Sequence, residues 1–420
     1  MGFASSWLGE RTLFPQLIDE APDPQTGIIV VIPAFNEPEI TLLLDSLLKC
    51  SNPVCGTELI IIVNAPDEAD KESLDNNLRC LKNIEAWKRE NADCFFRIHT
   101  VDITPRIQGE WSVGMARKTG MDEAVRRFDS LDKPEGIILS LDADCLVEGN
   151  YFTAVFEEMQ LRPDHQACSI YFEHPVSGVE FREGIYKAII LYELHLRYYF
   201  QALLFTGMPN VHHTIGSAIA VKALPYVKSG GMNRRKAGED FYFIQKLIPA
   251  GGFFNLYSTT VYPSPRSSSR VPFGTGVTVA KLAESESPVL YTYNINAFRE
   301  LKTLFRLVGK LQSGRPEDIK AIYQDLPPGL RSFIEVSEWM EKVAEIRKNT
   351  SGPESFRKRF FIWFNMFRIV KYLNAVHVSL FEKKPVQESV SELLSETGKH
   401  PGTDDALALL QYFRKTERGC

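Results

Sequence analysis

Short, continuous apolar runs that alternate with helix-like stretches limit the possible folds of this chain more than any other feature. The runs at residues 28–32, 59–63 and 137–141 are almost entirely aliphatic, which is typical of strands buried on both faces of a parallel sheet. Between the first and third of these runs, residues 40–48 and 71–91 have the apolar spacing of helices. This alternation predicts an α/β fold with helices covering a mostly parallel sheet.

Farther along, the character of the chain changes twice. Residues 262–276 are rich in proline, serine and glycine, which predicts a loop, and from about residue 288 onward the pattern is almost wholly helical. We therefore expect three parts: an N-terminal leader (1–26), an α/β domain (27–285) and a helical C-terminal domain (286–420).

Composition excludes several classes of protein. With 44% hydrophobic and 24% charged residues the chain has an ordinary globular composition, and its net charge of −5 argues against a nucleic-acid binder. Seven cysteines without a C-x-x-C pair are typical of free thiols in a reducing cytoplasm. The most apolar long stretch, residues 185–205, is interrupted by Lys187, Glu193, His195 and Arg197. We therefore expect a core helix there, no membrane-spanning segment and no secretory signal, in a cytoplasmic protein.

Two carboxylates follow the strand predicted at residues 137–141. Side chains two positions apart point the same way, so Asp142 and Asp144 are expected to project together from the carboxyl end of this strand. Ligands of open α/β sheets bind at that edge. Adjacent carboxylates repel each other and favour a divalent cation that carries phosphate oxygens. We predict a Mn²⁺ or Mg²⁺ site at Asp142 and Asp144.

Four motifs occur in an order that resembles one known family. They are residues 31–37 (VIPAFNE), 114–120 (GMARKTG), 142–144 (DAD) and 238–240 (GED). Together, over roughly residues 27–280, they resemble the GT-A-fold glycosyltransferases, family 2 in particular. The resemblance implies a hexosyltransferase that moves a sugar from a UDP- or GDP-sugar to a hydroxyl acceptor, with a divalent cation as cofactor.

The resemblance also implies roles for residues around the first two strands. Ala34 and Phe35 would flank the nucleotide base, Glu37 would accept a hydrogen bond, and Pro33 belongs to the same nucleotide-binding segment. The second strand of the family usually ends in an aspartate pair, whereas here Asn64 follows it. An amide both donates and accepts hydrogen bonds, so uracil and guanine both remain open as the base. A simpler explanation of the segment after Pro33 is a strand-to-helix turn.

The acidic pair before the helix predicted at residue 239 is the expected catalytic group. By the resemblance, Asp240 is the base that deprotonates the acceptor hydroxyl, with Glu239 as its neighbour, and the reaction inverts the anomeric centre. The simpler alternative is that Asp240 caps its helix, where aspartate is favoured, and both roles are compatible.

Four cationic residues are candidates for the diphosphate. Arg117 and Lys118 lie in the segment that supplies nucleotide contacts in the family, and Arg266 and Arg270 lie in the proline- and serine-rich loop, where related enzymes carry a mobile lid. Guanidinium groups bind phosphate through two parallel hydrogen bonds. The alternative for each residue is an ordinary solvated surface position.

Other interpretations of the sequence stay open. A sugar nucleotidylyltransferase also places carboxylates at strand ends, but it usually has a glycine-rich phosphate loop after the first strand, and residues 33–38 contain no glycine. A catalytically silent nucleotide-binding protein would keep the same fold. Aromatic residues at helical spacing over 356–370, interleaved with basic ones, are expected to pack against the catalytic domain, and peripheral membrane contact is the alternative.

Overall fold

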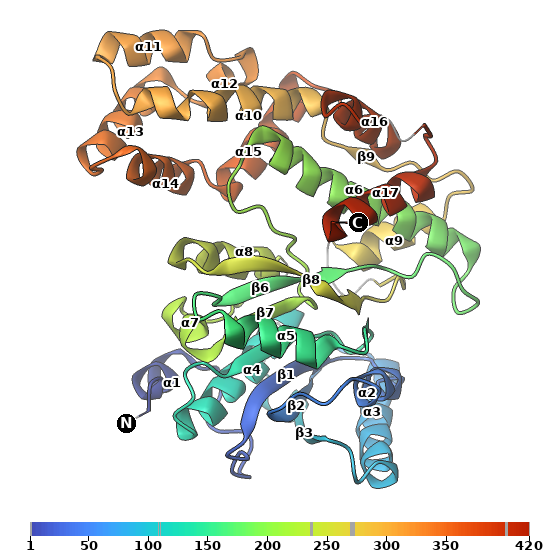
Figure 1. The fold of residues 1–420 in the computed structure, drawn as a ribbon. Coiled ribbons are helices and arrows are strands. Elements are labelled where there is room, and N and C mark those ends of the chain that lie inside the picture. The colour runs from blue at the N-terminus through green and yellow to red at the C-terminus, as the bar shows by residue number, and fades with distance from the viewer. Residues whose placement is uncertain are drawn as a thin grey trace. The chain divides into compact units, whose positions relative to one another are not determined.

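The computed structural model describes residues 2–107, 109, 111–235, 238–268, 274–399 and 402–419. The chain divides into two compact units (Figure 1). The sheet unit comprises Met1–Tyr186 and His212–Ala280, and the helical unit comprises Lys187–Val211 and Lys281–Cys420. The division after residue 280 lies near the boundary expected at 285. The segment at 187–211 groups with the helical unit, and the segment before residue 26 groups with the sheet unit.

The sheet unit contains an eight-stranded sheet in the order β3-β2-β1-β4-β7-β6-β8-β5. Its strands are β1 (Thr26–Ala34), β2 (Gly56–Val63), β3 (Phe96–Asp102), β4 (Ile137–Ser140), β5 (Leu146–Val147), β6 (Ala167–Phe172), β7 (Ile219–Lys222) and β8 (Phe253–Tyr262). The strands β3, β2, β1 and β4 are parallel to one another, as are β6 and β8, whereas β7 and β5 run antiparallel to their neighbours. The predicted mostly parallel sheet is confirmed.

Helices cover both faces of this sheet. One face packs against α2 (Thr41–Leu48), α3 (Lys71–Glu90) and α5 (Tyr151–Leu161). The other packs against α1 (Ser5–Arg11), α4 (Val113–Ser130), α7 (Ala223–Lys228) and α8 (Glu239–Leu247). The sheet unit also contains two short 3-10 helices, η1 (Thr104–Arg106) and η2 (Ile248–Ala250). The helix α9 (Thr275–Ala283) begins in the same unit, after β8.

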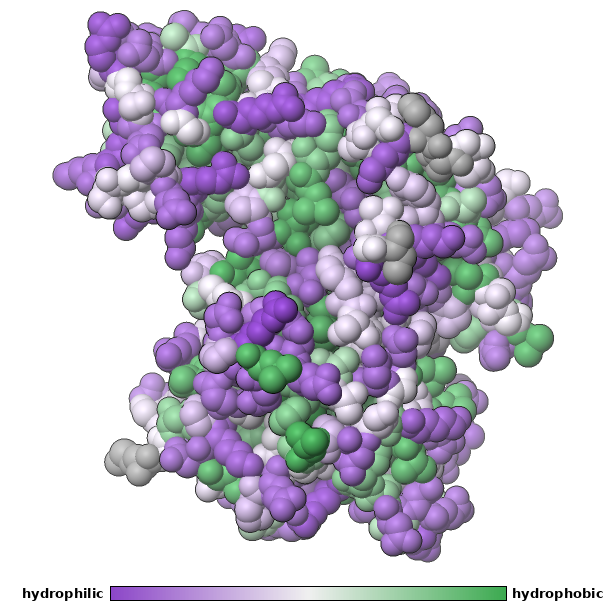
Figure 2. Space-filling model, in the orientation of Figure 1, coloured by the Kyte–Doolittle hydropathy of each residue, from purple (hydrophilic) through white to green (hydrophobic). Residues whose placement is uncertain are grey.

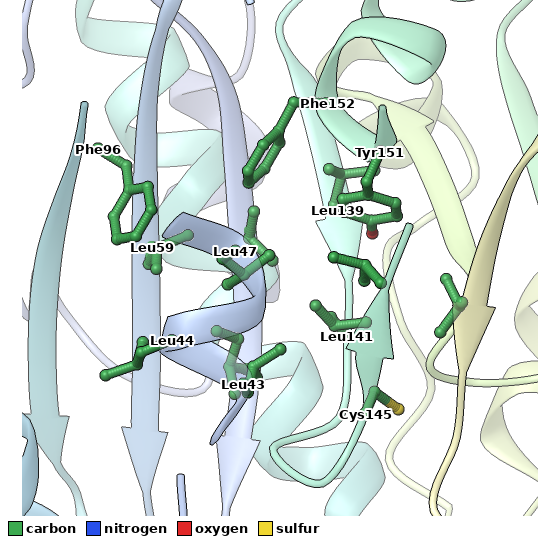
Figure 3. Packing of buried hydrophobic residues seen from close by; sticks show 14 of the residues in the cluster. Leu43, Leu44, Leu47, Leu59, Phe96, Leu139, Leu141, Cys145, Tyr151 and Phe152 are labelled. Carbon is green, nitrogen blue, oxygen red and sulfur yellow. The ribbon is translucent and has the colours of Figure 1, made fainter. Parts of the chain in front are cut away.

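The central strand β1 shows why the sequence folds this way. Ile28, Val30 and Ile32 point to the face covered by α2, and Ile29 and Val31 point to the face covered by α4. All five are fully buried, each contributing roughly 1.5–3 kcal/mol of hydrophobic stabilisation. Figure 3 shows the first of these cores, in which leucines of α2 face the sheet. A continuous apolar run is therefore required, because both sides of the strand are core.

The order of the strands fixes where a ligand can bind. The chain runs from β1 outward to β2 and β3, then returns to the other side of β1 for β4. Such a reversal leaves a crevice outside the carboxyl ends of the two strands that flank it, which is where ligands of open α/β sheets bind. In this sheet those strands are β1 and β4, which end at Ala34 and Ser140.

The helical unit consists of α6 (Glu183–Thr206), mostly assigned to it, and the helices that follow residue 294. These are α10 (Ile295–Leu307), η3 (Val308–Leu311), α11 (Pro316–Gln324), α12 (Pro328–Phe333), α13 (Val336–Lys348), α14 (Pro353–Trp363), α15 (Met366–Ser379), α16 (Val386–Glu396) and α17 (Ala406–Arg418). A two-stranded ribbon pairs β9 (Tyr291–Thr292) with β10 (Lys384–Pro385). The predicted helical C-terminal region is confirmed.

Aromatic side chains of α14 pack inside the helical unit itself. The ring of Phe361 lies 5.0 Å from that of Phe305, and the ring of Trp363 lies 6.3 Å from that of Trp339. Their expected packing against the α/β domain stays a prediction. Hydrophilic residues predominate on the visible face of the helical unit near α11 and α13 (Figure 2). In the described part of the chain, we find no helix with the length and apolar character needed to cross a membrane.

Candidate active site

The expected site residues of the first, second and fourth strands meet at one edge of the sheet. Strand β1 pairs with β2 on one side and with β4 on the other, all in parallel. Ala34 ends β1, Asn64 follows β2, and Asp142 and Asp144 follow β4. Because the carboxyl ends of parallel strands lie at the same edge, these residues lie at the edge where ligands of open α/β sheets bind.

Arg117 joins the end of β4 to the start of α8. Its Nη2 lies 2.6 Å from Asp142 Oδ1, and its Nη1 donates to Glu239 Oε1. The arginine comes from the first turns of α4 and is 2% exposed. Gly216 makes room for it, since a Cβ there would lie 3.0 Å from both terminal nitrogens. Arg117 is therefore a buried connection between two acidic segments. A solvated surface position, the alternative to a diphosphate contact, is thereby excluded for Arg117.

Arg266 makes a second connection at the same edge. Its Nε lies 2.6 Å from Asp144 Oδ2, and its Nη2 donates to Glu37 Oε1. The loop after β8 is thus tied to the segment after β1 and the segment after β4. Arg270, the other loop arginine of the prediction, lies outside the described residues.

Asp240 is the second residue of α8 and follows Glu239, whose carboxylate pairs with Arg117. Burial and the neighbouring charge of Glu239 raise the pKa of Asp240 to about 7, although Arg117 acts in the opposite direction. Its Oδ1 accepts from the backbone N–H of Phe241 at 2.7 Å. Gly238, with φ of 69°, precedes the helix in the left-handed conformation that favours glycine. A carboxyl group with this pKa can take up or release a proton near neutral pH.

Asn64 is held by the ends of the two neighbouring strands. Its Nδ2 donates to the backbone oxygens of Ala34, at 3.0 Å, and Ile62, at 3.1 Å. The side chain of Asn77, from α3, donates to the backbone oxygen of Asn64 at 2.8 Å. The amide is therefore fixed at the edge of the sheet before any ligand arrives.

Helix α3 also fixes the turn after β1. Asn36 has φ of 58°, a left-handed conformation that asparagine tolerates better than most residues. Its backbone N–H donates to Asn77 Oδ1 at 2.8 Å, and its own Oδ1 accepts from Asn76 at 2.6 Å. Phe35 in this turn is half-buried and Glu37 is buried, whereas Pro33 lies within β1.

Lys118 lies away from the strand ends, contrary to expectation. Its ammonium group is buried in an ion pair with Asp122 at 2.8 Å, and Asp122 also accepts from the hydroxyl of Tyr226 at 2.7 Å. Successive residues of a helix point about 100° apart, so Arg117 and Lys118 leave α4 in different directions and have different partners. We assign Lys118 a packing role.

Sequence reasoning missed three parts of this arrangement. Nothing in the sequence around Gly216 marks it as a site residue, because only its closeness to Arg117 in the fold makes it important. The pairing of Arg117 with Glu239 joins residues far apart in the sequence. The adjacent amides Asn76 and Asn77 were detectable, since two buried asparagines in a charged helix need polar partners.

The carboxylates at this edge fit a divalent cation that binds together with a phosphate group. In the described residues, no group of three His, Cys, Asp or Glu side chains forms a ready metal cage. The Asp142 and Asp144 side chains are 35% and 24% exposed, so both reach solvent. Mg²⁺ commonly takes one or two carboxylates and completes its coordination with phosphates and water. Among the described residues, five carboxylates and two guanidinium groups lie at this edge of the sheet.

Comparisons with known proteins give matches to solved structures alone, since no protein-family model and no curated protein sequence matches the chain. A structure of S. aureus TarS 1–349 with UDP-GlcNAc covers 82% of this chain and 93% of its own, at 13% identity and a TM-score of 0.40. Glucosyl-3-phosphoglycerate synthase from Mycobacterium tuberculosis, with Mn²⁺, UDP-glucose and glycerol 3-phosphate, covers 57% and 77%, at 14% identity and 0.35.

A third match is the mannosyltransferase PcManGT from Pyrobaculum calidifontis, in complex with GDP-Man and Mn²⁺. It covers 99% of this chain and 92% of its own length, at 13% identity and a TM-score of 0.34. With identities and scores this low, the function proposed below rests on this chain's own residues.

Proposed function

We propose that this chain is a metal-dependent glycosyltransferase that moves a sugar from a nucleoside diphosphate donor to a hydroxyl acceptor. One observation carries the proposal. Arg117 binds Asp142, at the carboxyl end of β4, and Glu239, at the start of α8. The carboxylate that we propose for the cation and the proposed base, Asp240, are thereby connected through one arginine.

The donor would lie across the ends of the strands. Asn64, Phe35 and Glu37 border the side where a nucleoside fits, and Asp142 and Asp144 would hold the divalent ion. When bound, that ion neutralises the charge that builds up on the departing diphosphate. Arg266 would add a guanidinium contact to the same phosphates, because it lies against Asp144.

Asp240 would accept the proton of the acceptor hydroxyl as its oxygen attacks the anomeric carbon. The bond from that carbon to the diphosphate oxygen breaks as the new bond forms, so the configuration inverts. A base works best when its pKa lies near the working pH, and burial gives Asp240 such a value. Arg117 contributes by position, since it holds Glu239 and with it the first turn of α8.

The test is release of nucleoside diphosphate from UDP- and GDP-sugars with and without Mn²⁺. We expect metal-dependent release by the wild type and its loss in Asp144→Ala. Glu157→Ala serves as a matched control, because Glu157 is an exposed carboxylate on α5. Release that is independent of metal, or equal in Asp144→Ala, contradicts the proposal. A protein that binds donor but never turns it over is a silent binding module.

Inversion has its own test. The anomeric proton of the product, followed by NMR from an α-linked donor, should report a β-linked sugar in the first turnovers. A retained configuration would remove Asp240 as the base and leave the donor site as proposed.

A further inference from the structure

We infer that Asn77, on α3, is a positioning residue for the nucleoside of the donor. It joins the turn after β1 (residues 35–37) to Asn64, the residue that follows β2, and so sets the distance between the two sides of the proposed nucleoside site. The inference deepens the proposed function and rests on it, because it concerns how the two sides of that site are held in place.

A single side-chain amide makes both connections. Asn77 Nδ2 donates to the backbone oxygen of Asn64, and Asn77 Oδ1 accepts from the backbone N–H of Asn36, each at 2.8 Å. An amide has a donor and an acceptor in one plane, so it can hold two backbone segments at a fixed separation. The reversed amide would place its NH₂ group against an N–H and its oxygen against a carbonyl oxygen, so the two backbone groups determine its orientation. Asn77 is buried, which shields both bonds from water.

The connection by Asn77 comes just after the two strands end. The parallel pairing of β1 with β2 runs to Ala34, opposite Val63, and the N–H of Asn64 donates to the backbone oxygen of Ala34 at 3.0 Å. Asn36 lies two residues beyond Ala34. Asn77 therefore continues, from a helix, the cross-strand connection that the backbone makes up to Ala34.

The turn after β1 needs such support, because its middle residue has an unfavourable backbone conformation. Asn36 has φ of 58°, in the left-handed region that residues other than glycine rarely adopt. Such a conformation persists where the surrounding contacts determine it. Here Asn76 donates to the side-chain oxygen of Asn36 at 2.6 Å, while Asn77 accepts from its backbone N–H. Two adjacent residues of α3 thus hold the turn in the conformation that places Phe35 and Glu37.

The position of Asn77 predicts an effect on donor binding and not on the chemical step. The turn after β1 and Asn64 border the two sides of the proposed nucleoside site, and both are bonded to Asn77. Asp240 belongs to α8, whose first residue pairs with Arg117 instead. Loss of the Asn77 bonds should therefore let the two sides of the nucleoside site shift against each other, while the base keeps its place.

Helix α3 also supplies a matched control. Asn83 is a partly buried asparagine of the same helix, and its Nδ2 donates to the backbone oxygen of Pro38 at 2.8 Å. In the described part of the chain, Asn83 makes this connection to one segment, whereas Asn77 connects to two. Removing the Asn83 bond should lower stability without changing the separation between the two sides of the nucleoside site.

The test compares Asn77→Leu and Asn77→Asp with Asn83→Leu. Leucine removes both bonds of Asn77, whereas aspartate keeps the acceptor for Asn36 and cannot donate to Asn64. Dissociation constants of UDP and GDP with Mn²⁺ are measured by titration calorimetry below each unfolding temperature. Release of nucleoside diphosphate gives kcat and the KM for the donor.

The expected effects concern the nucleotide that the wild type binds. Its dissociation constant and the donor KM should rise at least about tenfold in Asn77→Leu and at least about threefold in Asn77→Asp. At saturating donor, kcat should stay within about twofold of the wild type in both variants. In Asn83→Leu, the dissociation constant, KM and kcat should all stay within about twofold of the wild type.

Three results would overturn the inference while the proposed function stands. They are unchanged nucleotide binding in a folded Asn77 variant, a fall in kcat with unchanged binding, and a loss of binding in Asn83→Leu equal to that in Asn77→Leu. The last result would mean that the bonds act only through the stability of α3. A wild type that binds neither UDP nor GDP with Mn²⁺ would instead contradict the proposed function itself.

Discussion

Each unit of this protein contains a cluster of carboxylates and guanidinium groups, and the two clusters differ in ways that separate a site from a structural clasp. In the helical unit, Arg197 Nε lies 2.8 Å from Glu193 on α6, and Arg197 Nη1 lies 2.5 Å from Glu417 on α17. Arg414, also on α17, lies 2.7 Å from Glu193. We call these four residues the α6–α17 clasp.

The clasp is buried. Among the described residues it joins two glutamates to two arginines, and the side chains of Glu193 and Arg197 are fully buried. In the cluster at the edge of the sheet, the described carboxylates outnumber the described guanidinium groups, and the Asp142 and Asp144 side chains reach solvent. Buried balanced networks fix packing, whereas exposed unbalanced ones leave charge for a ligand to neutralise. The comparison predicts that the first cluster governs stability and the second governs activity.

The largest effect is expected from the candidate base. Asp240→Asn keeps the shape of the side chain but cannot take the acceptor proton, so kcat should fall about 100- to 10,000-fold. Donor affinity should stay near that of the wild type, because Asp240 has no role in holding the nucleotide. Steady-state kinetics and titration with donor measure the two effects separately. A variant with normal kcat would assign Asp240 only a capping role.

The second effect is on the clasp. Glu417→Ala removes one partner of the buried Arg197, which should lower the free energy of unfolding by about 3 kcal/mol. Binding of UDP with Mn²⁺, measured below the unfolding temperature, should not change. Urea denaturation quantifies the loss of stability. If this variant loses nucleotide binding while still folded, the division between a structural and a chemical cluster is wrong.

Arg117 sharpens the comparison, because it is as buried as the clasp but lies in the sheet-edge cluster. Arg117→Lys keeps the charge and loses the fork that joins Asp142 to Glu239. A base displaced by a fraction of an ångström should lower kcat roughly 10- to 100-fold. The KM for donor should change less than kcat. A purely structural arginine would instead show a lower melting temperature with unchanged kcat per folded molecule.

The smallest effect is on pH dependence. With a pKa of about 7, Asp240 is mostly protonated at pH 6, so the rate should be roughly tenfold lower there than on its alkaline plateau.

The same raised pKa of Asp240 has a consequence for the pH dependence of stability. Protonated Asp240 contributes stability that is fully present below its ordinary value of 3.8 and is lost as pH rises through about 7. Asp240→Asn should therefore gain stability relative to wild type between pH 5 and pH 8.

Much of the fold could be predicted because burial on both faces of a strand requires a continuous apolar run. The strand before Asp142 and the helix that begins at Glu239 lie where the pattern placed them. The strand β8 escaped prediction, because Ser258, Thr259 and Thr260 interrupt its apolar pattern. Residues 187–211 group with helices far along the chain, which a local pattern cannot show.

Part of the candidate site could also be predicted from the sequence. The apolar run predicts the strand that Asp142 and Asp144 follow, but β4 ends at Ser140, so strand alternation does not determine where these two side chains point. The partner of a cation depends on tertiary contacts. Adjacent Arg117 and Lys118 are equivalent in sequence, yet one joins Asp142 to Glu239 and the other pairs with Asp122. The Asn64 amide orientation is likewise set by the ends of two strands.

Titration calorimetry of UDP in the presence of Mn²⁺ tests the central claim most directly, using the wild type, Asp144→Asn and Glu417→Gln. We predict that the wild type and Glu417→Gln bind UDP with the same affinity. Asp144→Asn should lose at least about tenfold in affinity for UDP, about 1.4 kcal/mol. Equal binding by Asp144→Asn and the wild type would contradict it, because the carboxylates after β4 would then hold no metal-bound nucleotide.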